Sequence, residues 1–361
     1  MNVSPGKTRE WWRIGSSWRG LACASLLFIA WASSALADAD PRYFRIGTAA
    51  TGGSFFEIGA VVASAISSPV EGAPCTRGGD CGVPGLVAVA QATQGSVDNL
   101  RLVASGQIES GFVQADLAAM AYAGTGAFAG EAPARRLRAI ANLFPEALHI
   151  VVRVDSPIRS VADLAGKTIA VGDRGSGTAA NAKVLLAVAG FGENDVIRKF
   201  LRPAQAAEEL QAGTIDAFIL AGSYPVPAIQ ELAAVSPVRL VPITGGVAEI
   251  LEAQYAFYRA ATIPAGIYRN VDTDTATVGF FALWVVRDDA DEGLVHDITR
   301  AAWSENAAQL YAGLGPIGQR IKLANALKGM SLPLHPGAAR FYREQGFSLD
   351  DLPSPTEEPS R

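Results

Sequence analysis

The chain has 361 residues, of which 49% are hydrophobic and 18% are charged, a composition typical of a folded protein long enough for two lobes. Its formal net charge is −5, and loss of residues 1–37, which hold four basic residues and Glu10, would lower it to −8. A negative balance of this size argues against nucleic acid as a partner, because nucleic-acid binding needs a basic face.

The first 37 residues have the pattern of a secretory signal. Four basic residues precede the uncharged run GLACASLLFIAWASSALA, which ends in Ala-Leu-Ala at residue 37. A basic start, an apolar core and a small-x-small exit predict cleavage after Ala37 and export of a soluble protein to the periplasm. An uncleaved membrane anchor is the alternative, because 18 uncharged residues approach spanning length.

Two cysteines remain once Cys23 has left with the signal. Cys75 and Cys81 are separated by five residues, two of them glycine, in CTRGGDC. Cysteines in an exported chain usually pair, and this spacing closes a small ring without strain, so we expect a disulfide that clips a surface loop. A zinc site is the alternative, but no histidine lies nearby in the sequence.

Strand candidates alternate with helical runs along the remaining chain. In chain order, β-rich runs occupy 43–47, 110–116, 148–154, 167–172, 216–222 and 239–243, and helical runs occupy 55–66, 178–190 and 204–213, with more helix after residue 294. Gly190 and Gly213 are expected helix stops. This alternation predicts an α/β fold with parallel sheets and covering helices.

Two long strands, Ala147–Val154 and Gly279–Arg287, bracket a middle block with strands and helices of its own. A chain that leaves one lobe and later returns to it must cross twice, and we expect these strands to be the crossings. The predicted lobe one is therefore 41–150 plus 279–350, and lobe two is 151–278. The Pro-rich, charged end, 351–361, is expected to be a disordered tail.

Three segments share one pattern, an extended run followed by small residues and a helix start: 47–55, 93–100 and 171–178. A helix N-terminus presents unpaired N–H groups and a partial positive charge, and small residues let a ligand approach that backbone. If the loops of two lobes face each other, the cleft between them would bind a small anion, most simply a carboxylate, and Arg174 would add a full charge. The alternative is that each loop only caps its helix and that Arg174 is solvated.

Catalytic and metal-binding patterns are missing from the sequence. The segment GLGPIG, residues 313–318, matches a dinucleotide-binding pattern, but no strand precedes it and Pro316 lies inside it. His149, His296 and His335 are scattered without metal-ligand spacing. We expect no enzymatic activity, no metal and no cofactor.

The order and spacing of several motifs resemble the TAXI family, solute-binding proteins of TRAP (tripartite ATP-independent periplasmic) transporters. The resemblance runs from Tyr43 to Gly346, and its landmarks are GTAATGGSFFEIG, ATQGSVDNL, GFVQAD, DLAGKTIAVGDRGSGT, DAFILAGSYP, TIPAGIY and LPLHPGAARFYREQG. It implies a bilobed, periplasmic-binding-protein type II fold with a two-strand hinge. It also implies capture of a small organic acid or amino acid and delivery to TRAP permease membrane subunits without ATP.

The resemblance also implies ligand-binding residues in both lobes. The expected residues of lobe one are Thr48, Thr51, Gly52, Gly53, Ser54, Phe55, Thr93, Gly95, Ser96, Gln114 and Asp116. The expected residues of lobe two are Arg174, Gly175, Ser176, Gly177, Thr178, Gly222 and Tyr224.

The first loop departs from the family pattern, because Phe55 and Phe56 stand where many relatives have a tyrosine. The missing hydroxyl raises the hypothesis of a solute that is less polar than glutamate or lacks its amino group. Two other functions remain open: a receptor of the same fold that signals to a membrane protein, and an exported α/β enzyme.

Overall fold

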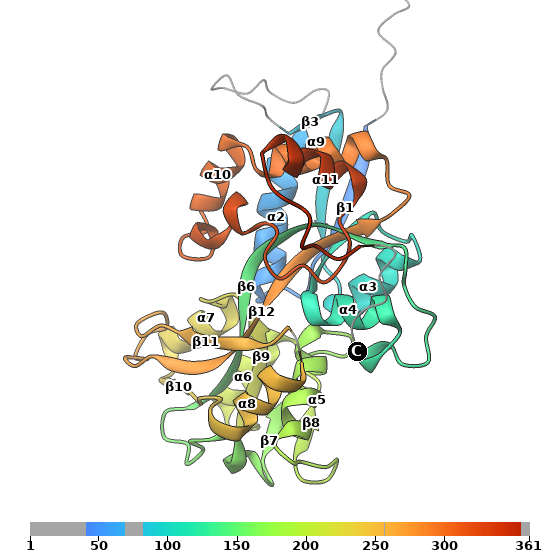
Figure 1. Ribbon diagram of the computed structural model, residues 1–361. Helices are drawn as coiled ribbons and strands as arrows, with labels where there is room; N and C mark the ends of the chain where they lie inside the picture. The colour runs from blue at the N-terminus through green and yellow to red at the C-terminus, as the bar shows by residue number, and fades with distance from the viewer. Residues whose placement is uncertain (1–40, 69–81, 256, 355–361) are drawn as a thin grey trace, which may run out of the picture. The chain divides into compact units, whose positions relative to one another are not determined.

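The computed structural model describes residues 41–68, 82–255 and 257–354, which belong to one compact unit, Pro41–Arg361 (Figure 1). The predicted signal, the Cys75–Cys81 disulfide and residues 355–361 of the predicted tail lie outside the described residues. Within that tail, residues 351–354 are described, and Leu352 packs against a hydrophobic cluster. The described residues contain no helix with the length and hydropathy of a membrane span.

Lobe one is built around parallel strands. Strand β1 pairs with β4 on one side and β5 on the other, both in parallel. The elements are β1 (Arg42–Gly47), α2 (Ser54–Ile66), β2 (Ser67–Ser68), β3 (Val83–Pro84), β4 (Leu86–Gln91), α3 (Ser96–Ala104), β5 (Ser110–Gln114), α4 (Ala115–Ala123) and the short helix η1 (Gly126–Phe128). Each of α2, α3 and α4 follows the carboxyl end of one of these strands, so the predicted loops lie at one edge of the sheet.

Lobe two repeats this plan around β7, which pairs in parallel with β8 and β9. Its elements are η2 (Val161–Leu164), β7 (Thr168–Ala170), α5 (Gly177–Val188), β8 (Ile197–Lys199), α6 (Pro203–Ala212), β9 (Ala217–Gly222), α7 (Pro227–Val235), β10 (Val238–Leu240), α8 (Gly245–Gln254) and β11 (Arg259–Ile263). Both predicted helix stops, Gly190 and Gly213, have positive φ, which glycine adopts without strain.

Two long strands join the lobes: β6 (Leu137–Arg153) and β12 (Thr275–Arg287). They pair with each other in antiparallel orientation, and each continues into the neighbouring lobe, β6 beside β9 and β12 beside β5 (Figure 1). Both strands begin earlier than predicted. The apolar run of β6 is interrupted by Pro145 and Glu146, but Pro145 pairs opposite Phe281 close to a bulge and stays within the strand.

Parallel pairs occur within each lobe, as predicted, but the sheet of the described residues is mixed as a whole. Every pair of β6 or β12 with another named strand is antiparallel. The reason is geometric: β6 carries the chain from lobe one to lobe two and β12 carries it back, so they run in opposite directions. The predicted α/β fold with two lobes and two crossing strands is confirmed. The exact lobe boundaries stay a prediction.

Each lobe has a core on both faces of its half of the sheet. Along β5, Phe112 and Val113 are both fully buried but belong to different clusters, as alternation across a strand requires. Along β6, Ile150 and Val151 divide in the same way between the two clusters of lobe two. Both halves of the sheet are therefore covered on both faces.

The C-terminal helices complete lobe one. They are α9 (Glu292–Ala302), α10 (Glu305–Ala312), η3 (Gly318–Arg320), η4 (Leu323–Asn325) and α11 (Pro336–Glu344). Apolar residues of α9, α10 and α11, such as Val295, Tyr311 and Phe341, belong to the same core cluster as α2. The expectation that the C-terminal helical part packs with lobe one agrees with this cluster.

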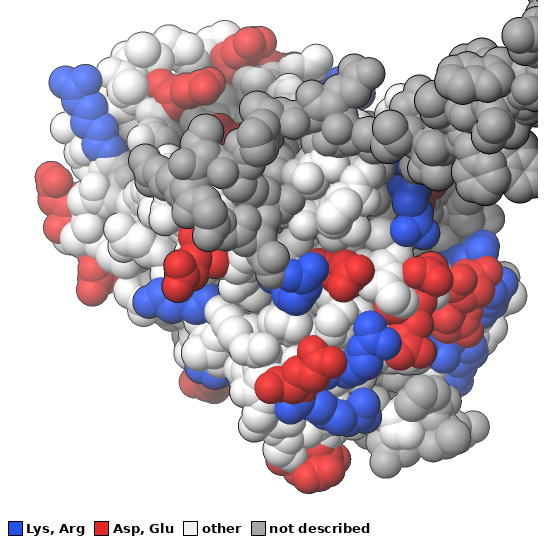
Figure 2. Space-filling view, turned by 90° about the horizontal axis from the view of Figure 1, so that it is seen from above, with Lys and Arg blue, Asp and Glu red and all other residues white. Residues whose placement is uncertain are grey.

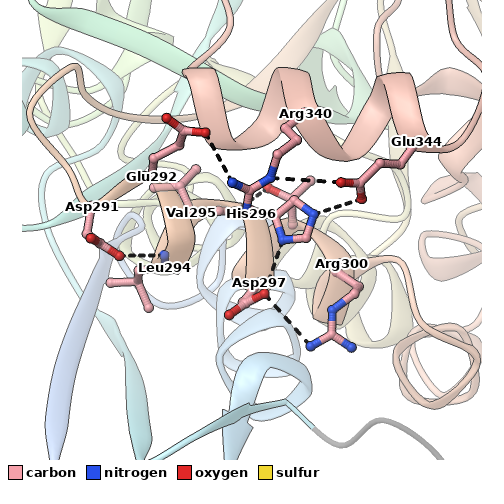
Figure 3. A network of polar contacts seen from close by, with 10 residues as sticks. Asp291, Glu292, Leu294, Val295, His296, Asp297, Arg300, Arg340 and Glu344 are labelled. Carbon is pink, nitrogen blue, oxygen red and sulfur yellow. Dashed lines mark hydrogen bonds and ion pairs between the residues drawn. The ribbon is translucent and has the colours of Figure 1, made fainter.

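Polar contacts fix α9 to α11 (Figure 3). His296 Nε2 lies 2.8 Å from Glu344 Oε2, and Arg340 donates to Glu292 Oε1 across 3.2 Å. Opposite charges are also interspersed on the face of the molecule seen from above (Figure 2). The contacts of His296 therefore join the two helices.

The other two histidines are buried and hydrogen-bonded. His149 Nε2 lies 3.0 Å from Tyr268 Oη, and His335 Nδ1 accepts a hydrogen bond from Gly337 N at the start of α11. Burial lowers the pKa of His149 to about 4. Among the described residues, no group of three or more His, Cys, Asp or Glu side chains is arranged to hold a metal ion.

Candidate ligand-binding site

A cavity of about 640 Å³, including its solvent-open part, lies where the loops of the two lobes meet. Its walls come from the loop before α2, the loop before α3, the ends of β5 and β9, the middle of β6, and the loops before α5 and α6. All three loops that the sequence marked therefore reach one cavity.

The first loop supplies Gly53, Ser54 and Phe55 to the cavity, together with Ala49 and Ala50. Ser54 and Phe55 are the first residues of α2, whose initial N–H groups have no partner within the helix. The chain can turn into the helix here because Gly52 has a φ of +86°, which glycine adopts without strain.

Other predicted residues of this loop lie away from the cavity lining. The Thr48 hydroxyl is buried and donates to the carbonyl of Gln91, 2.8 Å away. Thr51 is exposed. The carbonyl of Gly52 accepts a hydrogen bond from Ala228 N of lobe two, 3.1 Å away. Thr48 and Gly52 thus hold the loop in place, the first against β4 and the second against α7.

The second loop contributes Gly95 and Ser96, and β5 contributes Gln114 at its end. The Ser96 hydroxyl accepts a hydrogen bond from Gln114 N across 3.2 Å, which ties α3 to β5. Thr93 does not line the cavity; its hydroxyl donates to the carbonyl of Thr48, 3.0 Å away. The first and second loops are therefore joined beneath the cavity.

The third loop contributes Ser176, Gly177 and Thr178, the N-cap and first residues of α5. The Ser176 hydroxyl accepts from Ala179 N, which is the usual N-cap bond, and the Thr178 hydroxyl accepts from Ala221 N of β9. Gly177 lies directly against the Gln114 side chain, so a Cβ at this position would collide with that amide. Glycine here lets the two lobes approach.

Hydrogen bonds cross directly between the lobes beside the cavity. The carbonyl of Gly175 accepts from Val97 N and Asp98 N, at 3.1 and 3.2 Å, in the first turn of α3. Ser54 Oγ accepts from Ser223 N, 3.1 Å away. These donors and acceptors belong to opposite lobes, so the structure represents a closed arrangement of the two lobes.

Arg174 and Gly175 do not line the cavity. The Arg174 guanidinium lies over the ring of Phe200, 3.9 Å from its centroid. The neighbouring Asp173 lines the cavity instead, and its carboxylate pairs with Arg202 at 3.3 Å. The sequence pattern located the right loop, but the direction of each side chain depends on what packs against it.

Gly222 and Tyr224 lie beside the cavity without lining it. The Tyr224 hydroxyl donates to the carbonyl of Thr262, and its ring lies under the guanidinium of Arg320, 3.7 Å from its centroid. Gly222 lies close to Ser54 Oγ. Both residues support the wall rather than form it.

Asp116 is buried behind the cavity wall at the start of α4. Its Oδ2 accepts from the amide of Asn181 on α5, 3.0 Å away, and that amide also donates to Tyr258 Oη across 2.7 Å. Burial raises the pKa of Asp116 to about 6. Through its hydrogen bond with Asn181, the Asp116 carboxyl group links lobe one to lobe two.

Sequence reasoning missed Glu146, which lines the cavity from the middle of β6 with only 3% of its surface exposed. Burial raises its pKa to about 8; a hydrogen bond from Gln114 acts in the opposite direction, and the charge of Asp116 adds to the rise. The sequence did contain a sign of this residue's role, because Glu146 is the one acidic residue within the apolar run LFPEALHIVV. Such a residue is rarely buried without a functional or structural reason.

The remaining lining residues also escaped prediction. Gln94, Gly172 and Asp173 belong to the predicted loops, whereas an apolar wall comes from lobe two. That wall consists of Leu201, Pro203, Ala206, Ile219, Leu220 and Ala221. Apolar residues at the end of a strand or the start of a helix give no local signal that distinguishes a cavity wall from a core.

Comparison with known proteins assigns the family. Residues 46–346 match the NMT1-like family. Because this match spans most of the chain, the protein belongs to the NMT1-like family.

Several solved structures resemble the chain at low identity. The alkanesulfonate-binding protein SsuA from Xanthomonas axonopodis pv. citri, bound to MOPS, is 19% identical, with a TM-score of 0.45 and 84% of each chain covered. The periplasmic aliphatic sulphonate-binding protein SsuA from Escherichia coli is 18% identical, with a TM-score of 0.41, covering 84% of this chain and 79% of that one. The periplasmic binding protein BugD is 14% identical, with a TM-score of 0.49 and coverage of 84% and 93%. Because these TM-scores are below 0.5, the family assignment rests on the family match alone.

Proposed function

We propose that the protein is an extracytoplasmic solute-binding receptor that holds a small carboxylate or amino acid in the cavity between its lobes. The observation that carries this proposal is the convergence of three small-residue loops, from both lobes, on one cavity. Two crossing strands connect the lobes, which is the connectivity that hinge closure around a ligand requires.

The N-termini of α2 and α5 support an anionic group on the ligand. Ser54 and Phe55 begin one helix, Gly177 and Thr178 begin the other, and all four line the cavity. The positive ends of two helix dipoles and their free N–H groups stabilise a carboxylate without needing a basic side chain. Thus the absence of Arg174 from the lining does not remove the anion site.

We further propose that the receptor serves a TRAP transporter as a member of the TAXI family and delivers its solute to the permease membrane subunits. The motif resemblance over Tyr43–Gly346 and the match to the NMT1-like family over 46–346 are both compatible with this assignment. A permease gene beside the receptor gene, with loss of solute uptake when either gene is deleted, would support transport. Normal uptake without the permease would favour the signalling receptor instead.

Thermal-shift measurements on the mature protein test the binding function. A panel of small organic acids and amino acids is added at millimolar concentration, and a ligand that binds only the folded form must raise the melting temperature. At 100 times its Kd, a ligand adds about 2.7 kcal/mol of stability. A folded protein that no member of the panel stabilises would contradict the proposed solute class, and a turnover assay on the same panel tests the enzyme alternative.

A further inference from the structure

One end of the cavity consists of buried oxygen atoms that have no hydrogen-bond donor. Glu146 Oε2 and Gln114 Oε1 both belong to lining residues, which are 3% and 2% exposed, and neither atom has a partner. Behind them, Asp116 Oδ1 and Asn181 Oδ1 also lack partners. A buried acceptor without a donor costs free energy, so this cluster is suited to a ligand that brings N–H groups.

The described lining residues include carboxyl groups but no basic side chain. Glu146 and Asp173 are the carboxyl groups of the lining, and none of the described lining residues is Lys, Arg or His. The nearby guanidinium of Arg174 lies over Phe200, and that of Arg202 pairs with Asp173. No described basic side chain of the lining therefore pairs with Glu146 when its carboxyl group is ionised, and a cationic group on the ligand would do so.

The acceptor cluster adjoins an anion site. The Gln114 side chain lies against Gly177, the first residue of α5, so the acceptors and the positive end of that helix are neighbours. An α-amino acid carries its ammonium and carboxylate groups on adjacent carbon atoms. Neighbouring cation and anion sites match that arrangement, whereas a keto acid offers the acceptors no donor.

We propose that the cavity selects α-amino acids, with the ammonium group bound by Glu146 and Gln114 and the carboxylate at the N-termini of α2 and α5. This inference rests on the proposed solute-binding function and narrows its ligand class. It differs from the hypothesis that the Phe55–Phe56 pair selects a solute that is less polar than glutamate or lacks its amino group, and the ligand sets below decide between a solute with and one without an ammonium group.

Binding of an ammonium group requires the ionised form of Glu146, which faces Gln114 in the lining and Asp116 behind it. Its pKa is raised to about 8, so only about 1% is ionised at pH 6 and about half at pH 8. Affinity for an amino acid should therefore rise by at least about tenfold between pH 6 and pH 8, with proton release on binding. If neutral Glu146 instead donated to a ligand carboxylate, affinity would fall over the same range.

Calorimetric titration of the mature protein with matched ligands tests the proposal. Glutamate, 2-oxoglutarate and 2-hydroxyglutarate, and the corresponding set for leucine, differ only in the group at the second carbon. We expect the amino acid of a set to bind at least about tenfold more tightly than its keto and hydroxy analogues. Glu146→Gln should remove this preference, and Glu249→Gln on the exposed face of α8 is the matched control that keeps it.

The outcomes separate this inference from the proposed function. If keto or hydroxy acids bind as tightly as amino acids, or if Glu146→Gln keeps the preference, the ammonium site is refuted while the receptor function stands. If Glu146→Gln does not fold, the pH profile and proton release of the unaltered protein decide the matter. If no carboxylate or amino acid binds at all, the proposed solute class itself fails.

Discussion

At the scale of single residues, local sequence located loops but not side-chain directions. Ser176, Gly177 and Thr178 line the cavity, whereas Arg174, in the same loop, packs on Phe200. Glu146, whose pKa burial raises to about 8, lies in β6, a strand that was predicted from the sequence only as a crossing between lobes. Burial and neighbouring charge give a residue its chemistry, and both depend on distant parts of the chain.

Arg174→Ala should change ligand affinity by less than about twofold. The guanidinium lies over Phe200 outside the cavity lining, so its removal takes no hydrogen bond from the ligand. Calorimetric titration with the best ligand of the panel measures the effect. A loss of about 2–4 kcal/mol of binding free energy would instead mean that Arg174 forms a buried charge-assisted pair with the bound ligand.

Glu146→Gln should stabilise the unliganded protein increasingly as the pH rises. The unfolded state loses the Glu146 proton near pH 4.5, whereas the folded state keeps it up to about pH 8. The free energy of unfolding of the natural protein therefore falls as the pH rises from about 4.5 to about 8. Glutamine does not titrate. Urea unfolding at pH 5 and pH 8.5 should show a larger difference in favour of the variant at pH 8.5, and an equal difference at both would refute the raised pKa.

At the scale of elements, the strand–loop–helix pattern predicted the site well. The loops before α2, α3 and α5 all reach the cavity. The first two lie at one edge because β1 and β4 are parallel, and β7 runs in the opposite direction, so the loop before α5 reaches the same cavity from the other lobe. The N-terminus of α3 is used differently: its N–H groups bind the carbonyl of Gly175 in the opposite lobe. Thus one helix end closes the cleft, while α2 and α5 present their ends to the cavity.

Ser176→Ala should lower both stability and ligand affinity. The hydroxyl caps α5 by accepting from Ala179 N, and loss of an N-cap costs about 1 kcal/mol. Ser304→Ala is the matched control, because Ser304 caps α10 in the same way but lies outside the cavity. Urea unfolding should give similar losses for both variants, and titration should give weaker binding only for Ser176→Ala. Equal ligand affinities of the Ser176→Ala and Ser304→Ala variants would show that Ser176 does not contact the ligand.

At the scale of the whole described chain, two strands and a set of cross-lobe hydrogen bonds govern the cleft. Pairing of β6 with β12 runs from one lobe to the other with two register shifts, whereas the loops meet across the cleft through hydrogen bonds such as those of Gly52, Ser54 and Gly175. Such contacts can separate without disturbing either core. We therefore expect the lobes to open about the crossing strands.

Small-angle X-ray scattering should show that the mature protein contracts when its ligand is added. The closed arrangement is stabilised by a ligand that contacts both lobes, and the unliganded protein should populate more open states. The measurement is the radius of gyration with and without saturating ligand, and a non-binding analogue is the control. An unchanged radius in the presence of bound ligand would contradict hinge closure.

The sequence by itself determined the elements and the loops of this protein. Apolar periodicity, glycine stops and small residues before helices act over a few neighbouring residues, so strands, helices and the three loops were predictable. Only the tertiary structure decided that β6 and β12 make the sheet mixed, that Glu146 is buried beside Gln114, and that Arg174 faces Phe200. These features depend on contacts between residues far apart in the chain, for which the local sequence carries no signal.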